Sequence, residues 1–139
     1  MNRLWPAGRL FCAAPILGAG ERKVKRLWQA TINSWHGLVA VTRSEAAFRE
    51  ELALLIAGVP LAFFLTDHAG KRFALIGTLV FVLIVELLNT AIEKLSDRVT
   101  RKRDPAIKQV KDMGSAAILL SLLAAGATWI YVAVERFWP

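Results

Sequence analysis

The sequence feature that most constrains the fold is a long apolar run, Phe73–Ile92, which contains one carboxylate, Glu86, and one side-chain amide, Asn89. A helix of about 20 mostly apolar residues is long enough to cross the hydrocarbon core of a bilayer. A carboxylate inside hydrocarbon is unfavourable unless it has a partner, a cation or a chemical role. The run therefore predicts a membrane helix that carries function at its polar positions.

Four polar side chains share one face of this expected helix. At 100° per residue they fall within an arc of about 80°, and they are Glu86, Asn89, Glu93 and Asp97. Glu93 and Asp97 lie beyond the apolar run, where a solvated face is the ordinary explanation. Asn89 fits either a functional site or a hydrogen bond between helices. Glu86 is the strongest candidate for function, because it lies inside the run.

Composition favours one membrane domain over a soluble or nucleic-acid-binding protein. The chain has 139 residues, 55% of them hydrophobic, and Leu, Ala, Val and Ile occur in continuous blocks. The net charge is +7, but the basic residues stand between the apolar runs, where they set membrane topology, so we expect no nucleic-acid partner. Cys12 is the only cysteine, which excludes a disulfide framework and a thiolate metal cluster.

The predicted fold is all-α, with a surface helix followed by three transmembrane helices. Residues 1–20 form a poorly ordered extension, and residues 21–139 form one membrane domain. Residues 21–43 carry an apolar stripe with two tryptophans, and basic residues lie off that stripe, as in helices at a membrane interface. We expect spans at about 46–66, 73–92 and 115–134, with Ser44 as the N-cap of the first and a basic loop over 100–110 before the third.

The distribution of Lys and Arg predicts the orientation. Residues 1–50 hold eight and residues 94–111 hold seven, against two in the 67–72 turn and one after the third span. The positive-inside rule then places the N-terminal helix and the 94–111 segment in the cytoplasm.

One cytoplasmic surface would then gather carboxylates from two helices beside basic residues. Glu45 precedes the first span and Glu93 follows the second. Mg²⁺ is usually held by one or two carboxylates together with phosphate oxygens, and Lys111 can neutralise phosphate charge. Glu86, deeper in the bilayer, can accept a proton from a lipid hydroxyl. The residues favour phosphoryl transfer to a lipid alcohol, but by themselves they define only a membrane protein with a polar site at its cytoplasmic face.

Four segments carry a resemblance to a known family. They are S-W-H-G-L (34–38), E-A-A-F-R-E-E (45–51), V-E-L-L-N-T-A-I-E-K-L-S-D-R (85–98) and K-D-M-G-S-A-A (111–117). Their order and spacing resemble those of the small bacterial integral-membrane diacylglycerol kinases, over about Arg26 to Trp138. The resemblance implies transfer of the γ-phosphate of MgATP to diacylglycerol, giving phosphatidic acid. It also implies a homotrimer of three-span subunits in the bacterial cytoplasmic (inner) membrane, with active sites between subunits on the cytoplasmic side.

The resemblance implies roles for individual residues as well. Glu86 matches the general base, and Glu45 and Glu93 match the carboxylates that hold Mg²⁺. The nucleotide-binding positions are Arg26, Asn33, Glu45, Glu93, Lys102, Arg103, Asp104, Lys111 and Asp112. The lipid-binding positions are Arg26, Ser34, Trp35, Glu86, Asn89 and Ser115, and Asp97 lies close to the reaction centre. The 98–110 segment is more basic than is usual in the family.

Two alternatives remain open. A sister branch of the family phosphorylates undecaprenol, and its members usually read K-D-x-A-A where this chain has K-D-M-G-S at 111–115. Gly114 and Ser115 therefore favour diacylglycerol. The other alternative is a non-enzymatic membrane scaffold subunit whose polar face binds a partner helix.

Overall fold

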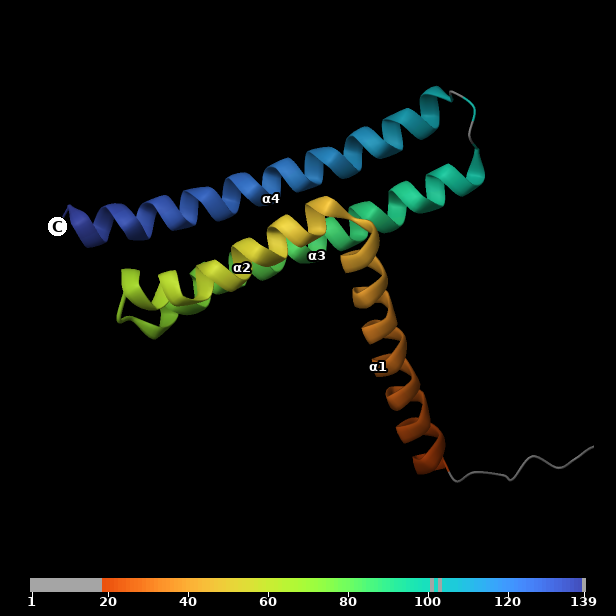
Figure 1. Ribbon diagram of the computed structural model, residues 1–139, viewed down its shortest axis with the longest axis horizontal. Helices are drawn as coiled ribbons and strands as arrows, with labels where there is room; N and C mark the ends of the chain where they lie inside the picture. Colours follow the sequence, from red (N-terminus) through yellow and green to blue (C-terminus); the bar gives the residue numbers. More distant parts are fainter. Residues whose placement is uncertain (1–18, 101, 103, 139) are drawn as a thin grey trace, which may run out of the picture. The chain divides into compact units, whose positions relative to one another are not determined.

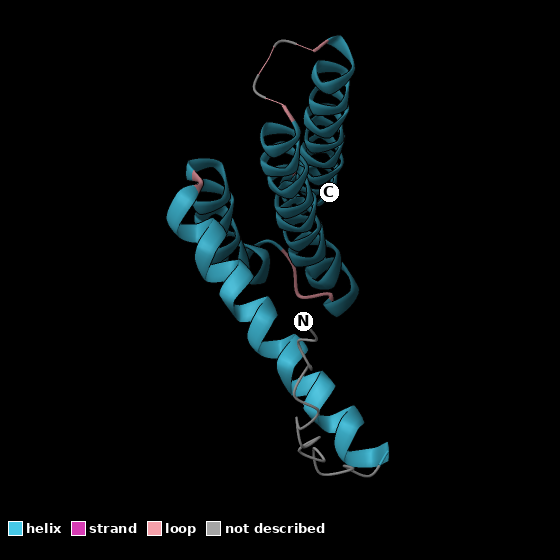
Figure 2. Cartoon of the chain, turned by 90° about the vertical axis from the view of Figure 1, so that its right-hand side faces the viewer, coloured by secondary structure: helices cyan, strands magenta, loops and turns pink. Residues whose placement is uncertain are grey.

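The computed structural model of the protein describes residues 19–100, 102 and 104–138. The described residues form four helices and no strand (Figure 1, Figure 2). The helices are α1 (Ala19–Ser44), α2 (Ala46–Leu65), α3 (Ala69–Val99) and α4 (Pro105–Phe137). The chain consists of two compact units, residues 1–37 and 38–139. Most of the extension expected over residues 1–20 lies outside the described residues.

α1 and α2 meet at Glu45, which has extended backbone angles, φ −112° and ψ 123°. The prediction that Ser44 caps the second helix is wrong. Ser44 is the last residue of α1, and Glu45 occupies the N-cap position of α2 without a capping hydrogen bond from its side chain. The Ser44 hydroxyl donates to Glu45 Oε1 at 2.9 Å and accepts from Lys94 Nζ at 2.8 Å. Ser44 is thus still part of α1, and its hydroxyl bonds to Glu45 and Lys94 instead of to the first backbone N–H groups of α2.

α3 is the central helix of the second unit and packs along both α2 and α4, which touch each other only slightly (Figure 1). The buried core consists of Ala62 and Leu65 of α2, Leu75 of α3 and Val132 of α4. Trp129 of α4 packs against this core, and its Nε1 donates to the Leu75 carbonyl at 3.2 Å. The core therefore joins all three helices near the α2–α3 turn.

The turn between α2 and α3 is organised by Arg72. Its Nε donates to the Thr66 carbonyl at 2.7 Å, and a terminal nitrogen of its guanidinium lies 2.9 Å from Asp67 Oδ1. The same guanidinium lies 4.5 Å from the centre of the Phe63 ring. A single side chain thus ties the end of α2 to the start of α3.

α3 and α4 are both long and apolar enough to cross a membrane. They have 31 and 33 residues, and each spans about 45–50 Å, more than the ~30 Å of a hydrocarbon core. Only 28% of the most apolar stretch of α3 and 17% of that of α4 is buried within the protein. Most of their apolar surface therefore needs lipid or another apolar partner.

α2 meets the length and composition of a membrane span less fully than α3 and α4 do. Arg49, Glu50 and Glu51 lie in its first two turns, and the uncharged stretch that follows, Leu52–Leu65, covers only about 21 Å at 1.5 Å per residue. Among the described residues only α3 and α4 have the length and composition of a span. Two of the three predicted spans therefore coincide with described helices that are long and apolar enough to cross a membrane.

The loop predicted over 100–110 is too long, because α4 begins at Pro105. The Asp104 carboxylate accepts from the backbone N–H groups of Ala106 at 2.8 Å and Ile107 at 3.3 Å. Asp-Pro supplies both an N-cap acceptor and a first helical residue with a suitable fixed φ. Residues 105–110 are therefore helical.

Candidate functional site

The polar face predicted on α3 is present, and its residues form what we call the polar strip: Glu86, Asn89, Thr90, Glu93 and Asp97. Glu86 is buried, with 7% of its surface exposed, and the Thr90 hydroxyl donates to its Oε1 at 3.5 Å. Glu93 is exposed, and its Oε1 accepts from Asn89 Nδ2 at 3.2 Å. The strip thus runs along one helix from a buried carboxylate to exposed ones.

The α1–α2 junction contributes a further carboxylate. Lys94 Nζ lies 2.9 Å from Glu45 Oε1, and because Lys94 follows Glu93, this pair places Glu45 beside the exposed end of the polar strip. The hydrogen bond from Lys94, helped by the one from Ser44, holds the pKa of Glu45 below its usual range. Glu45 is therefore an anion at neutral pH.

α4 approaches the polar strip at Gly114. A Cβ added at this position would lie 2.2 Å from Asn89 Oδ1, so glycine leaves the room that the Asn89 amide occupies. Asn89 Oδ1 is buried and has no hydrogen-bond partner within the protein. A buried acceptor without a partner is destabilising by about 1–3 kcal/mol. The polar strip therefore contains a hydrogen-bond acceptor without a partner, Asn89 Oδ1, one turn from Glu93.

The first turns of α4 carry the predicted pair Lys111 and Asp112. Lys111 Nζ pairs with Asp97 Oδ1 and so connects α4 to the polar strip. Asp112 pairs with Lys108 one turn away on α4 itself. Ser115, the next predicted position on this helix, is exposed. The structure thus brings Lys111 to the strip and leaves Asp112 in a pair within its own helix.

Other predicted positions are placed less directly. Lys102 and Asp104 are exposed in the segment before α4, where the Asp104 carboxylate caps the helix. Arg103 lies outside the described residues. The remaining candidates belong to the first unit, where all are exposed on α1: Arg26, Asn33, Ser34 and Trp35. Their roles stay predictions from the resemblance.

Glu51 of α2 was not among the predicted site residues. Its Oε2 is buried without a hydrogen-bond partner among the described residues. In the sequence Glu51 looked like one of the acidic residues that are favoured near the start of a helix. Its only distinguishing signal is that the uncharged stretch begins at the next residue, Leu52.

The carboxylates suit a magnesium ion better than a metal held by protein alone. Among the described residues, no three side chains of His, Cys, Asp or Glu gather closely enough to hold a metal. Glu45 and Glu93 offer two carboxylates near the exposed end of the polar strip. Mg²⁺ takes one or two protein carboxylates and completes its shell with water and phosphate oxygens, so this donor set fits Mg²⁺ on a nucleotide.

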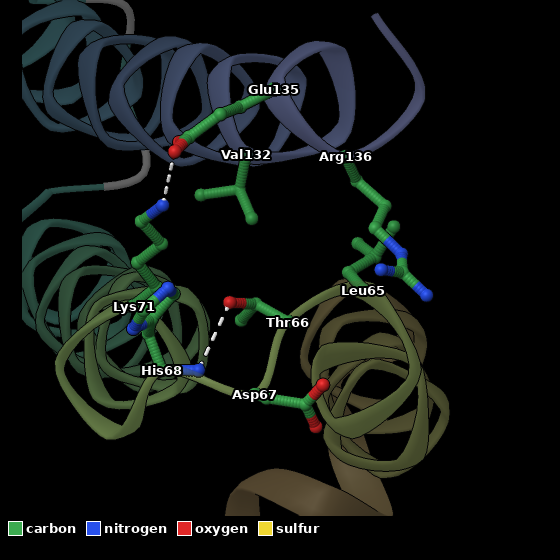
Figure 3. Close-up of a pocket in the computed structure, with 8 residues that line it drawn as sticks. All are labelled: Leu65, Thr66, Asp67, His68, Lys71, Val132, Glu135 and Arg136. Atoms are coloured by element: carbon green, nitrogen blue, oxygen red, sulfur yellow. Dashed lines mark hydrogen bonds and ion pairs between the residues drawn. The ribbon is translucent and has the colours of Figure 1, made fainter. Parts of the chain in front are cut away.

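A separate cavity of about 400 Å³ lies at the other end of the helices, beside the α2–α3 turn (Figure 3). Lys71 of α3 and Glu135 of α4 form an ion pair at its edge, and Arg136 lines it from α4 (Figure 3). None of the predicted site residues lines it. The ion pair fastens the end of α4 to α3, and we assign this cavity no chemistry.

Comparisons with known proteins identify the family of the chain. The family model described as prokaryotic diacylglycerol kinase matches residues 32–133. A protein named diacylglycerol kinase from Pseudomonas aeruginosa is 44% identical over 110 residues, which cover 79% of this chain and 89% of that protein. One from Escherichia coli K12 is 38% identical over 112 residues, covering 81% and 92%, and one from Haemophilus influenzae is 34% identical over 103 residues, covering 74% and 87%. The chain therefore belongs to the prokaryotic diacylglycerol kinase family.

Proposed function

We propose that the protein is an ATP-dependent kinase that transfers the γ-phosphate of MgATP to the hydroxyl of diacylglycerol, giving phosphatidic acid. Its family and its relatives named diacylglycerol kinase support this activity. The observation that carries the proposal is the buried Glu86, two turns from the exposed Glu93 on the same face of an apolar helix. This arrangement suits a lipid hydroxyl at the buried end and a water-borne nucleotide at the exposed end.

Glu86 is the general base of the proposed reaction. The lipid hydroxyl oxygen attacks the γ-phosphorus, its O–H bond breaks and the proton passes to Glu86, while the bond from the γ-phosphorus to the ADP oxygen breaks. The Thr90 hydroxyl donates to Glu86 Oε1, which leaves Oε2 to accept the proton. The Asn89 amide, with its unused Oδ1, lies one turn away and is proposed to bind the lipid hydroxyl.

Glu45 and Glu93 are proposed to hold Mg²⁺ at the exposed end of the polar strip. The ion, when bound, would neutralise and orient the phosphates. Lys94 keeps Glu45 ionised and occupies its Oε1. Oε2 of Glu45 is left for the metal, and the Lys94 ammonium opposes the binding of a cation to the same carboxylate by charge repulsion.

The remaining predicted positions belong to the two substrates. Lys111 is the best placed for the nucleotide, because its ammonium already lies at the polar strip and ammonium groups neutralise phosphate charge. The other proposed nucleotide contacts are Arg26, Asn33, Lys102, Arg103, Asp104 and Asp112. The other proposed lipid contacts are Arg26, Ser34, Trp35 and Ser115.

An apolar groove of about 350 Å³ between α2, α3 and α4 supports a lipid substrate. It is lined almost entirely by apolar side chains, including Leu54, Leu122 and Trp129. Such a surface suits acyl chains, since it offers no polar group that they would leave unpaired. Gly114 and Ser115, which depart from the pattern of the undecaprenol branch, favour diacylglycerol as the lipid.

We also infer a homotrimer in the bacterial inner membrane. In each subunit α2 would cross the membrane in addition to α3 and α4, and the polar strip would lie on the cytoplasmic side. The apolar surface that α3 and α4 leave exposed supports a partner subunit. The burial of Glu86 gives no support for a partner subunit, because a single chain already encloses this side chain. The orientation rests on the Lys and Arg of the N-terminal helix and of the segment between α3 and α4.

A paired lipid assay tests the proposal. Purified protein in micelles is supplied with radiolabelled ATP, Mg²⁺ and either diacylglycerol or undecaprenol, and the labelled lipid is counted. We expect faster turnover of diacylglycerol. Much faster turnover of undecaprenol would refute the lipid assignment, and no turnover of either lipid would favour the scaffold alternative.

Glu86→Gln tests the base in the same assay. The substitution keeps the size of the side chain and removes its ability to take a proton, so we expect turnover to fall by about 10²–10⁴-fold. The melting temperature and the oligomeric state in mild detergent should stay unchanged. Wild-type turnover by this variant would rule out Glu86 as the base.

A further inference from the structure

Lys94 of α3 was not among the predicted site residues, although it follows Glu93 directly in the chain. Its Nζ lies 2.9 Å from Glu45 Oε1 and donates to the Ser44 hydroxyl at 2.8 Å. That hydroxyl in turn donates to the same Glu45 oxygen at 2.9 Å. The three groups therefore form a closed triangle of contacts, which holds the ammonium between α3 and the α1–α2 junction.

The Lys94 ammonium keeps one N–H donor after these two contacts. A lysine ammonium has three N–H donors and no acceptor, and among the described residues it contacts two acceptors, Ser44 and Glu45. The side chain of Lys94 is 54% exposed, so the third donor is open to a ligand that arrives from water. Because the triangle already orders this long side chain, binding such a ligand costs less conformational entropy.

We propose that Lys94 binds the terminal phosphates of the nucleotide through this third donor. The inference rests on the proposed function, in which Glu45 and Glu93 hold Mg²⁺. A metal ion on Glu45 Oε2 shares that carboxylate with the ammonium on Oε1. Phosphate oxygens complete the shell of such an ion, so they come next to the same ammonium. Lys94 is then a further nucleotide-binding residue, supplied by α3.

The charges around the site favour a cation at this position. Glu45 and Glu93 are two carboxylates, and a magnesium nucleoside triphosphate keeps a net negative charge of its own. The ammonium of Lys111, also proposed to bind the nucleotide, is paired with Asp97. A charge-assisted hydrogen bond from Lys94 to a phosphate oxygen is stronger than a neutral one, and the ammonium offsets the repulsion between the phosphates and the Glu45 carboxylate.

Nucleotide affinity, measured without turnover, tests the inference. Purified full-length protein in one detergent is titrated by calorimetry, at saturating Mg²⁺, with AMP-PNP, a non-hydrolysable analogue of ATP. Lys94→Gln should weaken binding about tenfold, because a hydrogen bond to a charged group is lost. Thermal unfolding of each variant in the same detergent verifies that it is folded.

Glu45→Gln separates a direct phosphate contact from an effect exerted through Glu45. If Lys94 only positions or shields the Glu45 carboxylate, Lys94→Gln should have no effect once that carboxylate is gone. A direct contact predicts that the loss of about tenfold persists in the Glu45→Gln background. A loss that disappears in this background would overturn the inference.

Arg98→Gln is the matched control, because Arg98 is exposed and carries the same charge on nearly the same face of α3, one turn beyond Lys94. It should change the affinity by less than about twofold, because salt screens charges that do not touch the ligand. Equal effects of Arg98→Gln and Lys94→Gln would indicate a general attraction by positive charge and would overturn the inference.

Two further outcomes separate the inference from the proposed function. If the parent binds AMP-PNP and Lys94→Gln binds it equally well, the inference fails and the proposed function stands. If the parent does not bind AMP-PNP at all, the proposed function fails, and the inference fails with it.

Discussion

Gly114→Ala tests how α4 meets the polar strip. The added Cβ would lie 2.2 Å from Asn89 Oδ1, whereas carbon and oxygen atoms in contact are about 3.3 Å or more apart. The Asn89 amide or the backbone of α4 must therefore shift by about 1 Å. Rotation of the amide would break its 3.2 Å hydrogen bond to Glu93. Overpacking of this kind lowers the free energy of unfolding by about 1–3 kcal/mol.

Gly126→Ala is the matched control on the same helix, since no heavy atom lies within 4 Å of a Cβ built there. Alanine is favoured over glycine in a helix by up to ~1 kcal/mol, so this variant should be as stable as the parent or slightly more stable. Stability is measured by thermal unfolding in one detergent, and kinase activity is measured at a temperature where every variant is folded. Gly114→Ala should lose stability and turnover, and Gly126→Ala should keep its stability; Gly126 lines the apolar groove, so it serves as a control for stability alone.

Asn89→Ala supplies the second arm of a double-mutant cycle. In an Asn89→Ala background the obstructing oxygen is gone, so Gly114→Ala should cost almost no further stability, and the coupling should approach the full cost of the single substitution. Equal stability of Gly114→Ala and Gly126→Ala would refute the reasoning. Additive losses in the double variant would also refute it, because they would place the strain somewhere other than the Asn89 amide.

Three further substitutions follow from the contacts of α3 and α4. Lys94→Gln removes the ammonium that lowers the pKa of Glu45, so this pKa should rise and the acidic limb of the pH–activity profile should move to higher pH. At neutral pH the same variant should reach half-maximal activity at a lower Mg²⁺ concentration, and an unchanged Mg²⁺ titration would contradict the metal role of Glu45. Asp97→Asn breaks an ion pair whose side chains are 67% and 36% exposed, so thermal unfolding should show a loss below about 1 kcal/mol; a larger loss would mean that the pair holds α4 in place. Trp129→Phe removes the hydrogen bond to the Leu75 carbonyl and should cost about 0.5–1.5 kcal/mol in the same measurement, and no loss would show that this bond is dispensable.

The helices and the polar strip could be predicted from the sequence because both depend on local periodicity. The run around Glu86 specifies one helix, and the positions of its polar residues on that helix follow from 3.6 residues per turn. The start of α4 was missed, although Asp104-Pro105 is a strong helix-start signal, because the basic residues around it resembled a loop. Ser44 belongs to the preceding helix, because α1 continues to this residue, and its hydroxyl bonds to Glu45 and to Lys94, which lies fifty positions away in the sequence.

Contacts between helices could not be predicted, because they depend on which faces meet. Gly114 appeared in the sequence only as part of a family motif, and its close approach to Asn89 depends on how α4 packs on α3. The burial of Glu51 Oε2 is a second example. In the sequence Glu51 is only one of several acidic residues near the start of an expected helix, and its burial depends on packing. Residues on α1 remain assigned by resemblance alone.

The continuity of α3 has a consequence for substrate choice. The helix is unbroken from Ala69 to Val99, and at a rise of about 1.5 Å per residue it fixes the backbones of Glu86 and Glu93 about 10 Å apart along its axis. In the proposed reaction, this rigid spacing fixes the distance between the carboxylate that takes the proton and the carboxylate that holds the metal. A lipid alcohol would then be phosphorylated only if its hydroxyl lay at the level of Glu86 while the nucleotide was held at Glu93. Under this proposal, the depth of the hydroxyl below the headgroups would select among lipids, in addition to the apolar groove that suits their chains.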